Sequence, residues 1–161
     1  MRLFASLTLW MFVVGTGFIL GAGLYEMLVV VPFWAGNAPQ SLMADNPFLR
    51  VPIRSGQVFW PVVTPCLGII ALAAFLSSFG MPQKQMIWRL AGTGLLLIVT
   101  VVTLAYFRPS IINMVIHHGA GRPADTLAAD AKMWVALNWV RIAVVAASLG
   151  MGLRALTLPT A

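Results

Sequence analysis

The sequence predicts an all-α membrane protein, built as an up-down bundle of four transmembrane helices. Sixty per cent of the 161 residues are hydrophobic and 9% are charged, whereas a soluble domain carries about 25% charged residues. Four apolar segments, at 3–31, 59–79, 87–107 and 133–153, are separated by polar connections. Each reaches the roughly 20 residues that a helix needs to cross a bilayer. We therefore expect a single integral membrane domain that covers residues 1–161.

The first apolar segment is expected to be retained as a helix. It follows Arg2 and covers residues 3–31, which is longer than the roughly 7–15 apolar residues of a secretory signal. The connection at 80–86 has only a few residues. The second and third segments should therefore be antiparallel neighbours.

The connection at 32–58 is the longest in the chain. It is rich in Pro, Asn and Arg, but it also contains large apolar side chains. Long ordered loops of this kind pack on the domain surface and often cover a functional site. We expect this segment to fold down as a lid.

Helices three and four are expected to extend beyond the membrane, on the side of this lid. After Pro109 the apolar spacing of residues 111–115 is helical, and Gly119 is a plausible stop. Residues 123–125 then have the pattern of a helix start, with Asp125 in the first turn. The two extensions would lean on each other at one end of the bundle.

The positive charge is scattered along the chain. The formal net charge is +6, but no basic cluster is interleaved with aromatic residues, so we expect no nucleic-acid partner. Scattered cations suit anionic head groups, and the lipid bilayer is the expected partner. The positive-inside rule does not separate the two ends. Because the short connection at 80–86 is typical of a cytoplasmic loop, we expect an inner (plasma) membrane location with both termini in the cytoplasm.

Small residues recur at a spacing of four, as in Gly17 and Gly21 or Ala143 and Ala147. Such pairs let helix backbones approach closely. We expect them to pack the bundle internally, with assembly into a homo-oligomer as the alternative. Cys66 is the only cysteine, which excludes chemistry that needs a cysteine pair.

Arg141 lies near the middle of the fourth apolar segment. A guanidinium there cannot lose its proton and costs about 3 kcal/mol or more to hold in hydrocarbon, so it needs an internal partner, a wet cavity or a ligand. Asn138 is three residues earlier and therefore shares its helix face. The two residues predict a polar centre inside the bundle.

Glu26 is the corresponding residue of the first apolar segment. In an up-down bundle, Glu26 and Arg141 lie at similar depths, since each residue advances a helix by about 1.5 Å. One interpretation is a structural ion pair that fixes the bundle. The other is a shared polar pocket whose charges also hold a ligand.

His117 and His118 are adjacent, so at most one should face such a pocket. They are solvated loop histidines, or one of them is a general base, or one is a metal ligand together with Glu26. A metal site needs three or four donors, and the sequence contains no HxxxH or ExxH spacing. We expect no metal and no other cofactor, and we keep a metal held by Glu26 and one histidine as the alternative.

Short motifs in the second half of the chain resemble a known family. The motifs are Arg108-Pro109-x3-Asn113 and Trp134-x3-Asn138-x2-Arg141. They resemble the small four-helix membrane family that includes the fungal anthrone oxygenases and many bacterial proteins without an assigned role. The first helix, with Gly21-x3-Tyr25-Glu26 and Pro32, is similar to that family's first helix.

The resemblance implies an oxygenase that converts an anthrone to an anthraquinone without an obvious cofactor. Asn113, Asn138 and Arg141 are the positions that it carries over. An anthrone is flat, apolar and weakly acidic, so its oxidation needs a base, donors for the developing oxyanion and a dry pocket. His117 or Glu26 could be the base. The expected catalytic residues are therefore Arg141, Asn138, His117 and Glu26, and the expected ligand-binding residues are Asn113, Tyr25, Trp139 and Trp134.

Two other functions stay open on the sequence. The polar centre could be structural, with Glu26 paired to Arg141, in a non-catalytic membrane module that binds a hydrophobic molecule or a partner subunit. A metal-dependent membrane oxygenase that uses Glu26 and the histidine pair is the third alternative.

Overall fold

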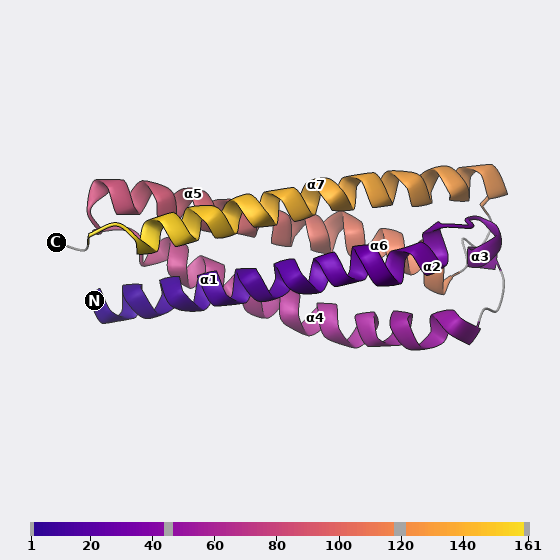
Figure 1. Cartoon of the computed structure of the whole chain (residues 1–161), viewed down its shortest axis with the longest axis horizontal. Helices are drawn as coiled ribbons and strands as arrows, with labels where there is room; N and C mark the ends of the chain where they lie inside the picture. The colour runs from indigo at the N-terminus through magenta and orange to yellow at the C-terminus, as the bar shows by residue number, and fades with distance from the viewer. Residues whose placement is uncertain (1, 44–46, 118–121, 160–161) are drawn as a thin grey trace.

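The computed structural model describes residues 2–43, 47–117 and 122–159, with side chains left out at 2, 43, 47–55 and 116. Four long helices dominate it, and no strand occurs in the described ranges: α1 (Arg2–Tyr25), α4 (Pro47–Leu76), α5 (Gln83–Val102) and α7 (Ala124–Leu156). They lie side by side, with both termini at one end and the short helices near the other (Figure 1). Four helical stretches are long and apolar enough to cross a membrane, as the sequence predicted. The chain is an integral membrane protein.

Two of the four long helices continue through irregular turns beside a proline. Helix α1 passes through the π-helical turn η1 (Glu26–Val30) into α2 (Val31–Ala35). Helix α5 passes through η2 (Thr103–Phe107), α6 (Arg108–Ile111) and a third π-helical turn, η3 (Ile112–Ile116). Pro32 and Pro109 lack the N–H that a regular helix would use, and wide π-helical turns are one way to absorb such an interruption. Val31 and Arg108 accordingly donate their N–H groups five residues back, to Glu26 O and Thr103 O.

Hydrophobic residues form two separate clusters. Near the termini, all four long helices contribute, for example through Phe12, Ala71, Leu96 and Val145. At the other end, the cluster is built from the α1–α3 region, the η2–η3 region and α7. No described side chain of α4 belongs to this second cluster. Among its described side chains, α4 therefore joins the common core only from Val63 onwards.

The segment expected to be a long lid loop is mostly helical. Residues 32–58 include α2, the short helix α3 (Gln40–Met43) and the first residues of α4. Helix two thus begins at Pro47, not near Phe59, because a proline is well tolerated in the first turn, where its missing N–H would have no partner. The predicted helical continuation after Pro109 and the helix start at Ala124 are both observed, while Gly119 lies outside the described residues.

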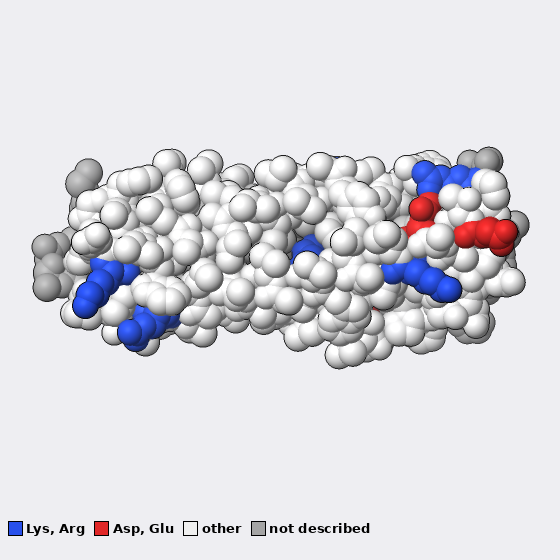
Figure 2. All heavy atoms as spheres, turned by 90° about the horizontal axis from the view of Figure 1, so that it is seen from above, with Lys and Arg blue, Asp and Glu red and all other residues white. Residues whose placement is uncertain are grey.

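The surface has the charge pattern of a membrane protein. Charged side chains gather towards the two ends of the molecule, and the long face between them is almost entirely uncharged (Figure 2). Large apolar side chains are exposed on each long helix, including Val14, Ile69, Val101 and Val140, which are 60–68% exposed. An apolar surface of this extent is unfavourable in water, whereas a bilayer covers it.

A second buried arginine, Arg89, lies near the termini. Its Nη2 donates to Ala5 O over 2.8 Å and to Ser77 Oγ over 3.0 Å, and its Nε donates to Ser78 Oγ over 3.2 Å. Ala5 lies in α1, and Ser77 and Ser78 directly follow the end of α4, so Arg89 connects α5 to α1 and to the turn after α4. Hydrogen bonds to a buried charge of this kind stabilise a particular packing of the helices.

Candidate functional site

An aromatic cavity of about 340 Å³ lies where α4 leaves the common core. Its wall combines one face of α4 with η1, α2, η2, α6, η3 and α7. Its aromatic residues are Trp34, Trp60, Phe107 and Trp134, and its charged residues are Glu26, Arg108 and Arg141. A mostly apolar cavity with a few convergent polar groups, of about 300 Å³ or more, is typical of small-molecule sites.

Glu26 enters the cavity from the first residue of η1. The Trp60 indole Nε1 donates a hydrogen bond to Glu26 Oε1 over 3.1 Å. This bond crosses from α4 to η1, and a charged acceptor makes it stronger than a neutral pair. The carboxylate therefore has a fixed orientation towards the cavity side of Trp60.

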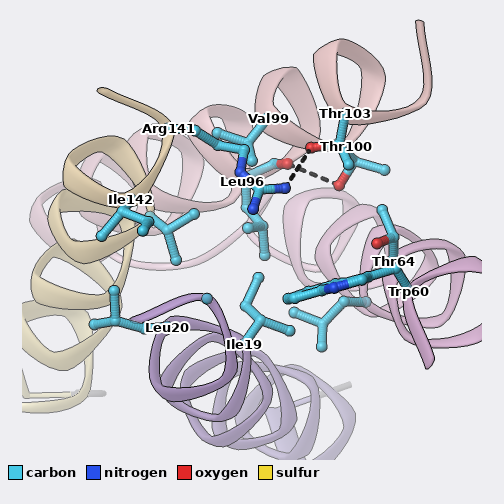
Figure 3. A pocket seen from close by; sticks show the side chains of 13 residues that line it. Ile19, Leu20, Trp60, Thr64, Leu96, Val99, Thr100, Thr103, Arg141 and Ile142 are labelled. Atoms are coloured by element: carbon cyan, nitrogen blue, oxygen red, sulfur yellow. Dashed lines mark hydrogen bonds between the residues drawn. The ribbon is translucent and has the colours of Figure 1, made fainter. Parts of the chain in front are cut away.

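Arg141 reaches the same cavity from α7. Its guanidinium carbon lies 5.0 Å from the centre of the Phe107 ring and 5.6 Å from that of Trp60, distances at which a cation is attracted to a ring face. Its Nη1 donates to Thr103 Oγ1 over 3.5 Å. Figure 3 shows Arg141 and Trp60 extending from α7 and α4 towards the same space, with the Thr103 bond as a dashed line.

Glu26 and Arg141 line one cavity but do not form a direct ion pair. No nitrogen of Arg141 lies within 4.0 Å of the Glu26 carboxylate, since the described ion pair is Arg122 with Asp130. Trp60 connects them, because its N–H contacts the acid and its ring contacts the cation. The cavity thus presents a proton acceptor and a fixed positive charge as separate groups beside aromatic rings.

Aromatic packing holds the far wall of the cavity. The centre of the Trp134 ring lies 5.3 Å from that of Trp34 and 5.8 Å from that of Phe107, and both pairs have edge-to-face geometry. Its indole N–H donates to Phe107 O over 3.3 Å. Edge-to-face pairs contribute about 0.5–1.5 kcal/mol each beyond area burial, so these contacts stabilise the wall.

The other residues expected at the site lie elsewhere. Asn138 is fully buried, donates from Nδ2 to Met27 Sδ over 2.7 Å, and its Oδ1 has no partner among the described residues. It does not line the cavity. Tyr25 and Trp139 are 62% and 42% exposed. Asn113 and His117 are exposed as well, outside the cavity lining, and His118 is not among the described residues.

The expected residues that the structure brings together are thus Glu26, Arg141 and Trp134. Within the described ranges, no group of three or more His, Cys, Asp or Glu side chains is placed to hold a metal ion. Glu26 and His117 in particular do not share the cavity.

Sequence reasoning missed Trp60, Thr103 and Phe107. None of the three carries a charge that would mark it in the sequence. The sequence feature that could have found them is the pair Pro32 and Pro109, because π-helical turns in helices occur frequently at functional sites. Both of the turns that precede these prolines line the cavity. No protein-family model matches the chain, and no curated protein or solved structure is significantly similar to it.

Proposed function

We propose that this protein is a membrane-embedded, oxygenase-like protein that acts on a flat, weakly acidic aromatic molecule of the anthrone or quinone type. The observation that supports this most is the placement of Glu26 and Arg141, without direct contact, in one aromatic cavity. If the base and the cation were already paired with each other, few of their hydrogen-bonding positions would remain free to bind a ligand. Here a planar molecule can contact both groups and lie against aromatic rings.

The proposed chemistry starts with proton transfer. Glu26 takes a proton from the acidic methylene carbon of an anthrone, and the resulting anion places its oxygen charge near Arg141. Dioxygen then bonds to that carbon. Glu26 returns its proton to the outer oxygen of the peroxide, the remaining methylene hydrogen leaves as a proton, and the O–O bond breaks. The departing hydroxide takes up that proton and becomes water. One anthrone and one dioxygen give one anthraquinone and one water.

Glu26 is preferred to His117 as the base because only Glu26 lines the cavity. Arg141 is the oxyanion partner. Trp60 orients the carboxylate, and Trp134 and Phe107 form the wall against which the rings stack. All of these residues come from one chain, so the site is complete in a monomer.

We further propose an up-down bundle in the inner (plasma) membrane, with both termini in the cytoplasm. The common end of the two termini supports this arrangement (Figure 1). Helix α7 has 33 residues, which at about 1.5 Å per residue exceed the roughly 30 Å of hydrocarbon. We assign the excess to the cavity end, where η3 and the first turns of α7 would extend beyond the membrane and α2 and α3 would cover the bundle.

The test uses purified protein in lipid nanodiscs with anthrone and dissolved dioxygen. We expect anthraquinone to form faster than in protein-free nanodiscs, and Glu26→Gln to lower kcat about 100-fold or more, since it cannot accept the proton. Arg141→Gln should lower kcat by a similar factor. Arg154→Gln, a change to an exposed arginine on the same helix, is the matched control. Equal rates in all four proteins would overturn the assignment.

A non-catalytic binding module is the second candidate, because each charged group already has a hydrogen-bond partner in the protein. Trp60 donates to Glu26, and Arg141 donates to Thr103. Such a module would bind anthrone or anthraquinone and release it unchanged. Quenching of tryptophan fluorescence by anthraquinone measures binding in either case. Binding without product formation would favour the module.

A further inference from the structure

A second, smaller cavity lies at the axis of the bundle, directly behind Arg141. Its volume is about 30 Å³, and its wall includes residues of all four long helices. It shares Trp60, Thr64, Thr103 and Arg141 with the wall of the aromatic cavity. The two spaces are therefore neighbours, and Figure 3 shows Trp60, Thr64, Thr103 and Arg141 around the smaller one.

The wall of this small cavity is mostly apolar, with Arg141 as its charged residue. Its buried apolar residues are Leu67, Leu96, Val99, Ile142 and Val145. Two of its hydroxyl groups have partners, since Thr100 donates back to Leu96 O over 2.9 Å and Thr103 accepts from Arg141. A water molecule needs two to four polar partners, whereas apolar cavities stay dry and take up apolar guests such as xenon.

The size of this cavity restricts its guest. A volume of about 30 Å³ exceeds the roughly 10–15 Å³ that one water-sized molecule needs, but it is far below the 340 Å³ of the aromatic cavity. An aromatic ring system does not fit. A diatomic gas does, and dioxygen, being apolar, partitions from water into the surrounding hydrocarbon.

We propose that the small cavity binds dioxygen and supplies it to the aromatic cavity past Arg141. Its role as a supply site depends on the proposed oxygenase activity, whereas gas binding can be measured without turnover. The proposed reaction consumes one dioxygen for each anthrone. A dry site beside the reacting carbon would hold that second substrate close to the anion.

Gly23 gives a sharp way to test this. A Cβ atom at Gly23 would lie 3.7 Å from Ile142 Cγ1, an ordinary contact distance, and Gly23 lines the small cavity but not the aromatic one. Gly23→Ala therefore fills part of the small cavity without a clash. Gly21→Ala is the matched control, because a Cβ there has nothing within 4 Å and Gly21 lines neither cavity. Val145→Ala enlarges the cavity and should act in the opposite direction.

The experiment is methyl NMR of the full protein in nanodiscs under dioxygen pressure, because paramagnetic dioxygen speeds the relaxation of nearby protons. We expect the methyl groups of Ile142 and Val145 to relax several-fold faster than those of Leu9 and Val13, which are also buried but line neither cavity. Gly23→Ala should reduce the excess at Ile142, Val145→Ala should increase it, and Gly21→Ala should leave it unchanged. In turnover, Gly23→Ala should raise the KM for dioxygen several-fold and leave the KM for anthrone unchanged.

Different failures have different meanings. If the methyl groups of Ile142 and Val145 relax no faster than those of Leu9 and Val13, the cavity does not bind dioxygen and the proposal is overturned. Turnover that depends on Glu26 and Arg141 would still stand. If the excess exists but Gly23→Ala leaves the KM for dioxygen unchanged, the supply role is overturned. If the wild-type protein shows no turnover at all, the proposed function fails and the supply role fails with it, while relaxation still decides gas binding.

Discussion

Trp60 donates its indole N–H to Glu26 across the gap between α4 and η1, with 3.1 Å between Nε1 and Oε1. The same ring lies 5.6 Å from the guanidinium carbon of Arg141. One side chain on α4 thus contacts both charged groups of the cavity. Since no described side chain of α4 belongs to the hydrophobic cluster at this end, the Trp60 contacts are an important link between α4 and the other helices there.

Replacing Trp60 can separate its two contacts. Trp60→Phe keeps a ring near Arg141 but removes the donor to Glu26, so we expect it to lower the free energy of unfolding by about 1–3 kcal/mol. Trp60→Leu also removes the ring and should cost about 0.5–1 kcal/mol more. Unfolding by SDS titration in mixed micelles measures both. If the two variants were equally stable, the ring would not contribute to holding Arg141.

A double-mutant cycle tests whether Glu26 and Arg141 are an ion pair. The two groups do not form a direct ion pair but share Trp60 as a partner, so Glu26→Gln and Arg141→Met should show a coupling energy of about 0.5–2 kcal/mol. Breaking a direct buried pair by removing one partner costs about 3–5 kcal/mol. The measurement is the free energy of unfolding of wild type, both single variants and the double variant. Coupling of about 3 kcal/mol would establish the structural ion pair.

Asn138 is predicted to tolerate an apolar replacement. It is fully buried, and its Oδ1 has no partner among the described residues. Because Asn138→Leu removes this unsatisfied atom and keeps the number and branching of the side-chain heavy atoms, we expect stability to change by less than about 1 kcal/mol, in either direction.

Anthraquinone binding by Asn138→Leu, followed by tryptophan fluorescence, should match wild type. A large loss of binding in a stable Asn138→Leu protein would instead give this residue the ligand role that its motif implied. Ser148→Ala is a useful comparison, since the buried Ser148 hydroxyl does have a partner, Gly92 O at 2.8 Å.

Two glycines on α7 should respond oppositely to alanine. A Cβ at Gly152 would lie 2.7 Å from Phe12 Cε1 and 2.9 Å from Val13 Cγ2, both in the buried core, whereas Gly150 has nothing within 4 Å. We expect Gly152→Ala to destabilise the protein by about 1–3 kcal/mol through overpacking. Gly150→Ala should be neutral or stabilise by up to about 1 kcal/mol. Thermal unfolding in detergent would show this, and equal melting temperatures would contradict the close packing of α1 on α7.

The parts of the fold that depend on length and polarity could be predicted from the sequence. Four helices follow from four apolar segments, because only a helix satisfies its own backbone in lipid. A charged side chain in hydrocarbon is unfavourable unless it faces a partner or a cavity inside the protein. The free energy of burying a charge was therefore sufficient to identify Arg141 and Glu26. The start of α4 at Pro47 was missed, because prolines and arginines in that segment are also typical of loops.

The face of each helix that points inward was harder to predict. In water an apolar stripe marks the core, but lipid is as apolar as the core, so the pattern no longer distinguishes them. Trp60 and Trp139 are both tryptophans within apolar helices, yet Trp60 lines the cavity and Trp139 is 42% exposed. Asn138 shares a helix face with Arg141, but it packs on Met27 instead of opening into the cavity.

The π-helical turns also bear on how this chain could tolerate changes in its length. Each such turn holds about one residue more than an α-helical turn, so η1 can lose a residue and become regular without rotating the segments on either side. Deleting the exposed Leu28 should thus leave Trp34 turned towards its present neighbours. The same deletion at the exposed Val14, in the regular part of α1, would turn one half of the helix by about 100° relative to the other. Insertions and deletions among homologues of this chain should therefore collect at η1, η2 and η3.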